Sequence, residues 1–413
     1  MSALHTLDSP HDRPTGPRAA TPVTNGLLAV SLAAMEVNRP VPVDIWNTKG
    51  VLLLRKGQAL ATLERQQVLS RHQPAIRESD RRDWLLAGQA LSDQMPRAGP
   101  SQPPGLPEAT PHSLGEHWMD LHARLAVLLH QHVGVRDFLL RFEALRHKAV
   151  TLMDRHPDES LFVLVQMLYD TQVGYSASNA LATAAVCHVI GPTAGLSVDQ
   201  ESSLFNAALT MNMGMARLQD QLAVQKDGPT EGQLETIRQH PHVGRDMLQQ
   251  LGVTDTHWLA LVRDHHESSE GGGYPTGQRV NDTAQQLLQL ADRFVARISP
   301  RKTRRGQSVR AAVRAQYLEM QRQANPLGQL LVKQLGMYLP GSYVLLNSGE
   351  IAVVTRSTSD LKAPMVMAIV GKNGIPLSAP SVRDTAQANF AIQDTVSSDD
   401  VRVRLDPARL FGL

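Results

Sequence analysis

The spacing of hydrophobic positions changes along the chain and divides it into parts. Residues 1–25 are rich in Ser, Thr, Pro and His and show no apolar period, which is typical of a disordered segment. Over 41–57, two short apolar runs flank an Asn-Thr-Lys-Gly turn, a pattern that predicts a β-hairpin. Apolar residues with helical spacing follow over residues 60–72. We therefore predict a small α+β module over residues 26–92.

A proline-rich stretch separates this module from the rest of the chain. Residues 96–111 contain six prolines and two glycines, so they lack backbone donors and cannot bury a core. We interpret 93–115 as a linker. Beyond it, apolar positions recur with helical spacing, and we predict a helical domain over 116–325. Two helix starts fit a capping box, Ser197 with Gln200 and Thr230 with Gln233.

The pattern changes again near the C-terminus. Two pairs of apolar runs, over 342–357 and 364–378, each surround a turn that contains glycine. This arrangement predicts two β-hairpins and a β-rich extension over 326–413. The chain as a whole is predicted to be mainly α, with a small module at each end of the helical domain.

Composition narrows the classes of function. Lys and Arg number 41 against 39 Asp and Glu, so no strong basic field would attract a nucleic acid polymer. The single cysteine, Cys187, excludes disulfides within the chain and Cys-rich metal sites. The longest near-apolar stretch, Leu27–Met35, is about half the length that crosses a bilayer, and no secretory signal pattern is visible. We expect a soluble, cytoplasmic protein without membrane contact.

The most unusual stretch is DHHESSEGGGYPTG, residues 264–277. His265 continues the apolar stripe of the helix before it, in phase with Trp258, and His266 lies one step further round. Two adjacent imidazoles at a buried helix end need partners. Two interpretations stay open: the histidines bind a metal, or a hydrogen-bonded core histidine stands beside an exposed one.

A glycine loop follows the histidines. Gly271 and Gly273 permit backbone angles that other residues avoid and allow a ligand or another segment to approach closely. Tyr274 and Pro275 end the loop. A flexible turn closed by a proline is the simpler interpretation, and a glycine run without a preceding strand is no nucleotide-binding fingerprint.

Two further polar positions lie next to apolar helix faces. His240 precedes Pro241, and because proline suits the first position of a helix, we expect one helix to end near His240 and another to begin. The imidazole then either points into a cleft or caps a helix in solvent. Asp292 lies on the flank of an apolar face, where its carboxylate needs a cation or hydrogen-bond donors.

A basic run without an acidic residue covers 301–314 and includes Arg301 and Arg304. The guanidinium group of an arginine can donate two hydrogen bonds to phosphate oxygens. A solvated helix face is the alternative interpretation of such a run.

Together, the HHE-SSE-GGGYP sequence resembles the signature of the HD-GYP family, bacterial metal-dependent phosphodiesterases of cyclic di-GMP. The family pattern has Asp-Gly-x-Gly-Tyr-Pro after the histidines, and Glu270 replaces its Asp here. Segments 239–244, 287–292 and 301–304 resemble further family segments, and the resemblance covers about residues 155–325. It implies an HD-type helical fold, a metal set of His240, His265, His266 and Asp292, and substrate contacts from Gly271, Gly273, Tyr274, Pro275, Arg301 and Arg304.

The chain departs from the family at one pentapeptide. The family's His-Asp-x-Gly-Lys falls on Met211-Asn212-Met213-Gly214-Met215, and Asn179 stands where an earlier family histidine would lie. A thioether is a soft ligand and an amide has no net charge, so neither replaces imidazole and carboxylate around a divalent ion. Phosphodiester hydrolysis needs metal-bound hydroxide and charge stabilisation on the phosphoryl oxygens. The resemblance thus leaves either one divalent metal (iron, manganese or zinc) or none.

We predict a degenerate HD-GYP-type cyclic di-GMP signalling protein. In this interpretation it is a nucleotide-binding effector or a protein-interaction scaffold without efficient hydrolysis, and a signalling protein is its partner. The alternative is an active metal-dependent phosphodiesterase with an altered metal site. A third possibility is an interaction platform that binds no nucleotide.

Overall fold

The structure is a computed structural model, and the chain divides in it into two compact units, Met1–Glu108 and Ala109–Leu413. The division falls within the segment 93–115. The structure describes residues 22–23, 27–29, 40–47, 50–58, 74–80, 113–131, 137–170, 172–403, 405 and 410–411.

The described part of the N-terminal unit is a five-stranded antiparallel sheet of order β1-β2-β5-β3-β4. Its strands are β1 (Pro22–Val23), β2 (Leu27–Ala29), β3 (Ile45–Asn47), β4 (Leu52–Leu54) and β5 (Pro74–Arg77). The predicted hairpin is confirmed: Ile45 pairs with Leu54, and the Asn47 side chain accepts a 2.8 Å hydrogen bond from the Val51 amide. β1 lies inside the segment expected to be disordered, and the predicted helix over 60–72 lies outside the described residues.

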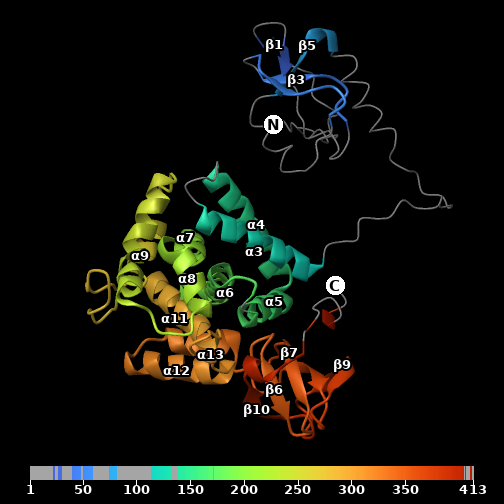
Figure 1. The fold of residues 1–413 in the computed structure, drawn as a ribbon, viewed down its shortest axis with the longest axis vertical. Helices are drawn as coiled ribbons and strands as arrows, with labels where there is room; N and C mark the ends of the chain where they lie inside the picture. The colour runs from blue at the N-terminus through green and yellow to red at the C-terminus, as the bar shows by residue number, and fades with distance from the viewer. Residues whose placement is uncertain are drawn as a thin grey trace, which may run out of the picture. The chain divides into compact units, whose positions relative to one another are not determined.

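The second unit is mainly helical, as predicted (Figure 1). Its helices are α3 (Leu114–His130), α4 (Phe138–Arg155), α5 (Pro157–Tyr169), α6 (Tyr175–Ile190), α7 (Val198–Thr210), α8 (Ala216–Val224), α9 (Glu231–Gln250), α10 (Thr256–Asp264), α11 (Thr283–Ile298), α12 (Val309–Arg322) and α13 (Leu327–Leu335). α6 is buried on nearly every side because small and apolar residues surround its axis, and α3, α5, α7 and α11 pack against it. No helix in the described parts of the chain is long and apolar enough to cross a membrane.

Both predicted capping boxes are confirmed. The Ser197 hydroxyl accepts from the Gln200 amide at the start of α7, and the Gln200 side chain accepts from the Ser197 amide. Thr230 and Gln233 exchange the same pair of hydrogen bonds at the start of α9. These contacts satisfy amides that have no partner within the helix.

The predicted helix end near His240 is wrong. α9 runs without a break through Pro241, and both residues are buried. Proline lacks the N–H that would bond the carbonyl of Ile237, four residues earlier. The imidazole of His240 takes that place, with Nδ1 2.5 Å from the Ile237 oxygen. The helix therefore continues because a side chain satisfies the carbonyl that the proline leaves free.

The C-terminal part is a five-stranded antiparallel sheet of order β10-β6-β7-β8-β9. Its strands are β6 (Tyr343–Leu346), β7 (Ile351–Arg356), β8 (Met365–Val370), β9 (Pro376–Asp384) and β10 (Ile392–Val396). Both predicted hairpins are present, β6–β7 and β8–β9. Helical structure runs past the expected boundary at residue 325, because α13 precedes the sheet. The sheet packs on α5, where Gln166 donates to the Gly341 carbonyl at 2.7 Å and accepts from the Tyr343 hydroxyl.

Candidate functional site

Three histidines that the sequence singled out come together in the helical part. His240 lies on α9, and His265 and His266 follow the end of α10. The candidate ligand nitrogens of all three lie within 4.8 Å of one another. His240 and His265 are buried, and their Nε2 atoms are 3.1 Å apart. We call His240, His265 and His266 the histidine cluster.

Hydrogen bonds to the backbone fix the orientation of two of these rings. His240 Nδ1 lies 2.5 Å from the Ile237 carbonyl oxygen, and His265 Nδ1 lies 2.8 Å from that of Val262. A carbonyl only accepts, so each Nδ1 carries a hydrogen and each neutral ring presents the lone pair of its Nε2. The second nitrogen of a metal-bound histidine is commonly held in this way.

Two lone pairs that face each other at 3.1 Å repel unless a cation lies between them. Imidazole nitrogens at about 2.0–2.1 Å from a shared metal ion stand roughly 2.8–3.4 Å apart at angles between about 90° and the tetrahedral angle. The separation of the two Nε2 atoms falls in this range. The donor set of the histidine cluster therefore fits a divalent metal ion.

The sequence explains why the two carbonyls that orient the rings have no N–H partner within their helices. Pro241 cannot donate to Ile237, so that oxygen is available to His240. Val262 lies in the last turn of α10, where helix carbonyls have no partner within the helix. A proline directly after a histidine was a visible signal, although we interpreted it as a helix end.

Burial keeps the histidine cluster in its neutral form. It lowers the pKa of His240 to about 3, with a further contribution from His265, and it lowers the pKa of His265 to about 4. It also holds the pKa of His266 well below its usual value, and the two neighbouring imidazoles act in the same direction. Neutral imidazole is the form that coordinates a metal.

The glycine loop is tied to the histidine cluster. The Tyr274 ring stacks on His266 with ring centres 4.4 Å apart. A Cβ on Gly273 would lie 2.6 Å from the Cα of Glu267, so only glycine fits there. Glu267 is completely buried, and one of its oxygens accepts from the amide and hydroxyl of Thr276 at 2.6 and 2.8 Å. Sequence reasoning did not select Glu267, although an acid directly after two buried histidines is a signal.

Two other predicted contact residues shape the same loop. Gly271 has φ +86°, a left-handed conformation in which a side chain would be strained. The peptide bond between Tyr274 and Pro275 is cis. The loop conformation thus depends on the glycine and on the buried carboxylate of Glu267 together.

Asp292 lies on α11 and is not part of the histidine cluster. Burial raises the pKa of its carboxyl to about 6, while Arg301 and Arg293 oppose the shift. The same carboxylate raises the pKa of the Tyr274 hydroxyl, after burial as the main cause. Asp292 therefore acts electrostatically on both the glycine loop and the arginines.

The two predicted arginines have different surroundings. Arg301 donates to the Tyr175 hydroxyl at 2.7 Å, and its guanidinium carbon lies 4.6 Å from the centre of that ring. Its buried Nε has no hydrogen-bond partner among the described residues. Arg304 is exposed and donates to the carbonyl of Ala296. Of the two, Arg301 has a buried donor without a described partner, whereas Arg304 does not.

The positions that depart from the family pattern form an uncharged group. Asn212 and Gln219 donate to the side-chain oxygen of Asn179 at 3.3 and 3.4 Å. We call Asn179, Asn212 and Gln219 the amide cluster. All three are buried, as are the neighbouring Met211 and Met213. The amides bond one another, and no carboxylate or imidazole comes from the pentapeptide.

Gly214, the pentapeptide position that matches the family, has a packing role. A Cβ on it would lie 2.9 Å from the Gly244 amide of α9 and closer still to the carbonyl oxygen of His240. The pentapeptide therefore touches α9 beside the histidine cluster. Met215, at the position of the family's lysine, is half-buried and carries no charge.

Comparisons with known proteins show what this chain is similar to. The model of the HD domain family matches residues 162–325. The chain is 25% identical over 203 residues to the cyclic di-GMP phosphodiesterase PA4108 of Pseudomonas aeruginosa, which is 48% of each protein. It is 27% identical over 146 residues to the cyclic di-GMP phosphodiesterase response regulator RpfG of Xanthomonas campestris pv. campestris, which is 34% of this chain and 38% of that protein.

The chain thus spans about half or less of the curated relatives it matches. Among solved structures, it is similar to Bd1817, a HDG"Y"P protein from Bdellovibrio bacteriovorus, with a TM-score of 0.42 and 12% identity over 74% of this chain and 98% of that one. The family match, the relatives and the two-histidine and Gly-Tyr-Pro sequence agree. Residues 162–325 of this chain match the HD domain family, and the chain is similar there to phosphodiesterases of the HD-GYP type.

Proposed function

We propose that this protein is a cyclic di-GMP effector that binds the nucleotide through its HD domain and does not hydrolyse it efficiently. The observation that carries the proposal is the amide cluster with its buried methionines, which stands where the resemblance expects a His-Asp pair. The two phosphodiesterase relatives support cyclic di-GMP as the ligand.

The histidine cluster would hold one divalent metal ion, and Asp292, which acts electrostatically on Tyr274 beside the cluster, would be the carboxylate that balances its charge. Such an ion supplies Lewis-acid stabilisation of a phosphoryl oxygen when it is bound. Met211 and Asn212 offer no charged ligand for a second ion beside the first, because a thioether is soft and an amide is neutral. Two cooperating metals would therefore lack ligands from the pentapeptide.

Arg301 would contact a phosphate of the nucleotide. Its Nε is buried without a partner, and a guanidinium fork binds two phosphate oxygens at once. Tyr274 would meet a base or ribose, since its ring already stacks at the edge of the histidine cluster. Gly271 and Gly273 would allow close approach of the ligand to the loop backbone.

The test measures metal content, nucleotide binding and turnover on the same purified chain. We expect no more than one metal per chain by plasma mass spectrometry, and cyclic di-GMP binding by calorimetry that persists after chelation. We expect no turnover with added manganese or iron. Arg301→Ala should weaken binding, whereas Arg238→Ala, an exposed residue of α9, should leave it unchanged.

Two metals per chain, with turnover that His265→Ala abolishes, would contradict the proposal and indicate an active phosphodiesterase. Absence of nucleotide binding in both metal-loaded and chelated protein would instead indicate an interaction platform that binds no nucleotide. Each result distinguishes one of the three functions that the sequence left open.

A further inference from the structure

A groove lies between α12 and α13, outside the candidate site. It encloses a hollow of about 430 Å³. Its apolar lining consists of Val313, Tyr317, Val332, Met337 and Leu361. We call this hollow the α12–α13 groove.

The packing of the two helices explains where the groove opens. They approach closely near their connecting loop, where a Cβ on Gly328 would lie 2.7 Å from the Cβ of Met320. The hollow lies further from the loop, between Val313 on one helix and Val332 on the other. Leu361, from the connection between β7 and β8, closes its far end and is 38% exposed. The apolar floor is thus built by three separate segments.

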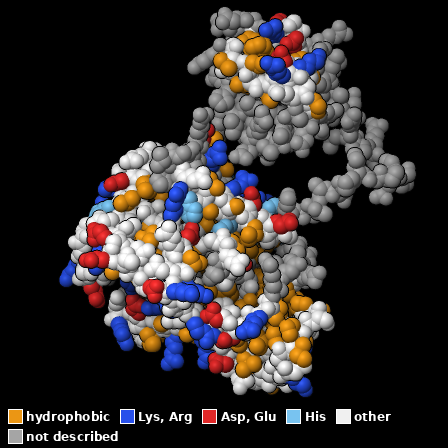
Figure 2. All heavy atoms as spheres, viewed as in Figure 1, with side chains coloured by type: hydrophobic (Ala, Val, Ile, Leu, Met, Phe, Trp, Pro, Cys, Tyr) orange, Lys and Arg blue, Asp and Glu red, His pale blue; other side chains and the backbone are white. Residues whose placement is uncertain are grey.

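Both walls of the groove carry a cation. Arg314 stands on α12 and Lys333 on α13, and both are exposed. Neither forms an ion pair with any residue that the structure describes, and no acidic residue lines the groove. Arg310 extends the basic edge by one turn of α12. Figure 2 shows Lys and Arg side chains, with Asp and Glu among them, over the surface of the helical unit.

We propose that the α12–α13 groove binds an amphipathic helix of a protein partner, with an apolar stripe and acidic residues on both sides of it. A third helix laid against two packed helices buries the stripe in the groove. Acidic residues on its flanks would meet Arg314 on one wall and Lys333 on the other. The proposal is independent of nucleotide binding at the histidine cluster.

The shape of the groove favours a helix over a membrane surface. Its apolar side chains line a hollow, and Val313 is completely buried at the bottom of it. A bilayer takes up apolar groups that protrude from a protein, together with basic residues around them. A protruding side chain from a partner reaches the floor of a hollow, whereas a flat bilayer does not.

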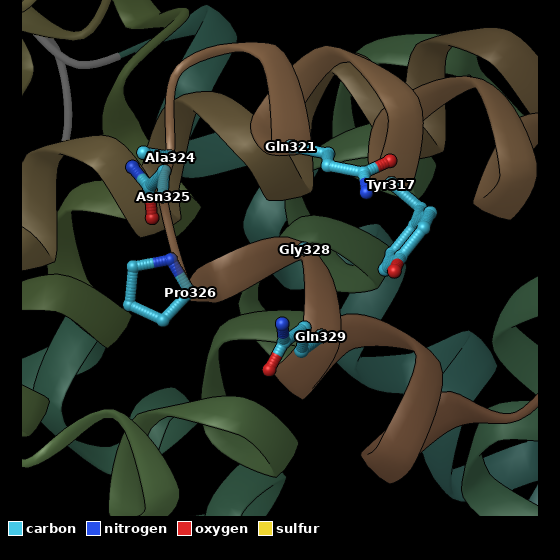
Figure 3. Close-up of a pocket in the computed structure, with 7 residues that line it drawn as sticks. All are labelled: Tyr317, Gln321, Ala324, Asn325, Pro326, Gly328 and Gln329. Carbon is cyan, nitrogen blue, oxygen red and sulfur yellow. The ribbon is translucent and has the colours of Figure 1, made fainter.

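A polar pocket continues the groove at one end. Figure 3 shows this pocket of about 180 Å³, which shares Tyr317 and Gln329 with the groove. Gln321 also lines it, as does Asn325, whose side-chain amide already bonds Gln286 and the Leu327 amide. Side-chain amides both donate and accept, so they suit the end of a helix, where backbone groups have no partner within the helix. A partner helix that runs along the groove would end against the side-chain amides of Gln321 and Gln329.

The test uses two synthetic amphipathic peptides of about five turns that share a leucine stripe. One carries glutamates on both flanks and the other carries lysines. We expect the full chain to bind the acidic peptide at least about tenfold more tightly in fluorescence anisotropy. The double variant Arg314→Glu/Lys333→Glu should reverse this preference, and Val332→Asp should weaken the binding of both peptides. Arg238→Glu and Val224→Asp, exposed on α9 and α8, are matched controls.

Equal affinity for the two peptides, or a preference that Arg314→Glu/Lys333→Glu leaves unchanged, would overturn the proposal. So would binding to phosphatidylglycerol vesicles without peptide binding, which would assign the surface to a membrane. A dimer in sedimentation that the same double variant dissociates would assign the groove to a second copy of the chain. Thermal unfolding of each variant checks that its fold is intact.

Discussion

The two sides of the candidate site differ in what holds them. On one side, backbone carbonyls orient His240 and His265 so that their lone pairs converge. On the other side, Asn179 and Asn212 hydrogen-bond each other, and neither the amide cluster nor the Met211–Met215 pentapeptide contains a charged residue. Gly214 joins the two sides because α9 packs directly on it.

This difference separates packing from ligand chemistry. Gly214 is required wherever α9 crosses the pentapeptide, whether or not a metal is bound nearby. Met211 and Asn212 are not constrained in that way, since buried methionine and a bonded amide fill the same space without charge. Under the proposed function, the fold keeps the glycine of the motif for packing while the ligand positions carry other residues. The variants below test that separation.

Restoring the family residues should give the largest effect. Asn179→His/Met211→His/Asn212→Asp places a carboxylate and two imidazoles in a buried, uncharged region. Without metal, we expect the free energy of unfolding to fall by about 3–5 kcal/mol, because a buried charge has no partner. Added manganese should recover the loss and raise the metal content to two per chain, as measured by thermal unfolding and mass spectrometry.

Asn212→Asp alone is the matched control for this variant. It introduces the charge without the imidazoles, so manganese should not restore its stability. A triple variant that is as stable as the parent and takes up no metal would show that these positions do not face the histidine cluster.

Single truncations should affect the two sides in different ways. His265→Ala removes one imidazole, and we expect metal affinity to fall by more than about a hundredfold. Met211→Ala removes buried apolar volume, which should cost about 2–5 kcal/mol of unfolding free energy while the metal content stays unchanged. Metal titration and chemical denaturation of both variants measure the two effects. Equal loss of metal in both would contradict the separation.

Pro241→Ala tests how the sequence orients a ligand. An alanine would supply the N–H that bonds the Ile237 carbonyl, and this hydrogen would compete with His240 Nδ1. We expect metal affinity to fall by about tenfold, as for the loss of other groups that orient a metal ligand. The free energy of unfolding should stay the same or rise, because proline is unfavourable inside a helix. Opposite signs in metal titration and thermal unfolding would identify Pro241 as a positioning residue.

The fold was largely predictable because its signals are local. The capping boxes at Ser197 and Thr230 and the glycine turns of the C-terminal hairpins each involve residues close in sequence. The helix through Pro241 was not, because its continuity depends on a side chain bonding the freed carbonyl. Sequence rules treat proline as a helix end when they consider the backbone alone.

The sequence predicted which residues belong to the candidate site, but it did not predict how they are arranged. The histidines at 240, 265 and 266 were selected from the sequence, and their convergence depends on the packing of α9 against α10. Arg301 and Arg304 looked alike in a basic run, yet only Arg301 has a buried donor without a described partner. The buried role of Glu267 also follows from the folded loop, since its partners lie nine and ten residues further along the chain.

The smallest expected effect distinguishes these two arginines. Arg301→Ala should weaken cyclic di-GMP binding by about tenfold, since it removes a charge-assisted contact at a site where the guanidinium is already ordered by Tyr175. Arg304→Ala should change binding by less than about threefold, because that side chain is exposed and a neighbouring carbonyl already accepts from it. Calorimetry at two salt concentrations measures both, and a loss at Arg304 equal to that at Arg301 would place the phosphate on the exposed turn instead of beside Asp292.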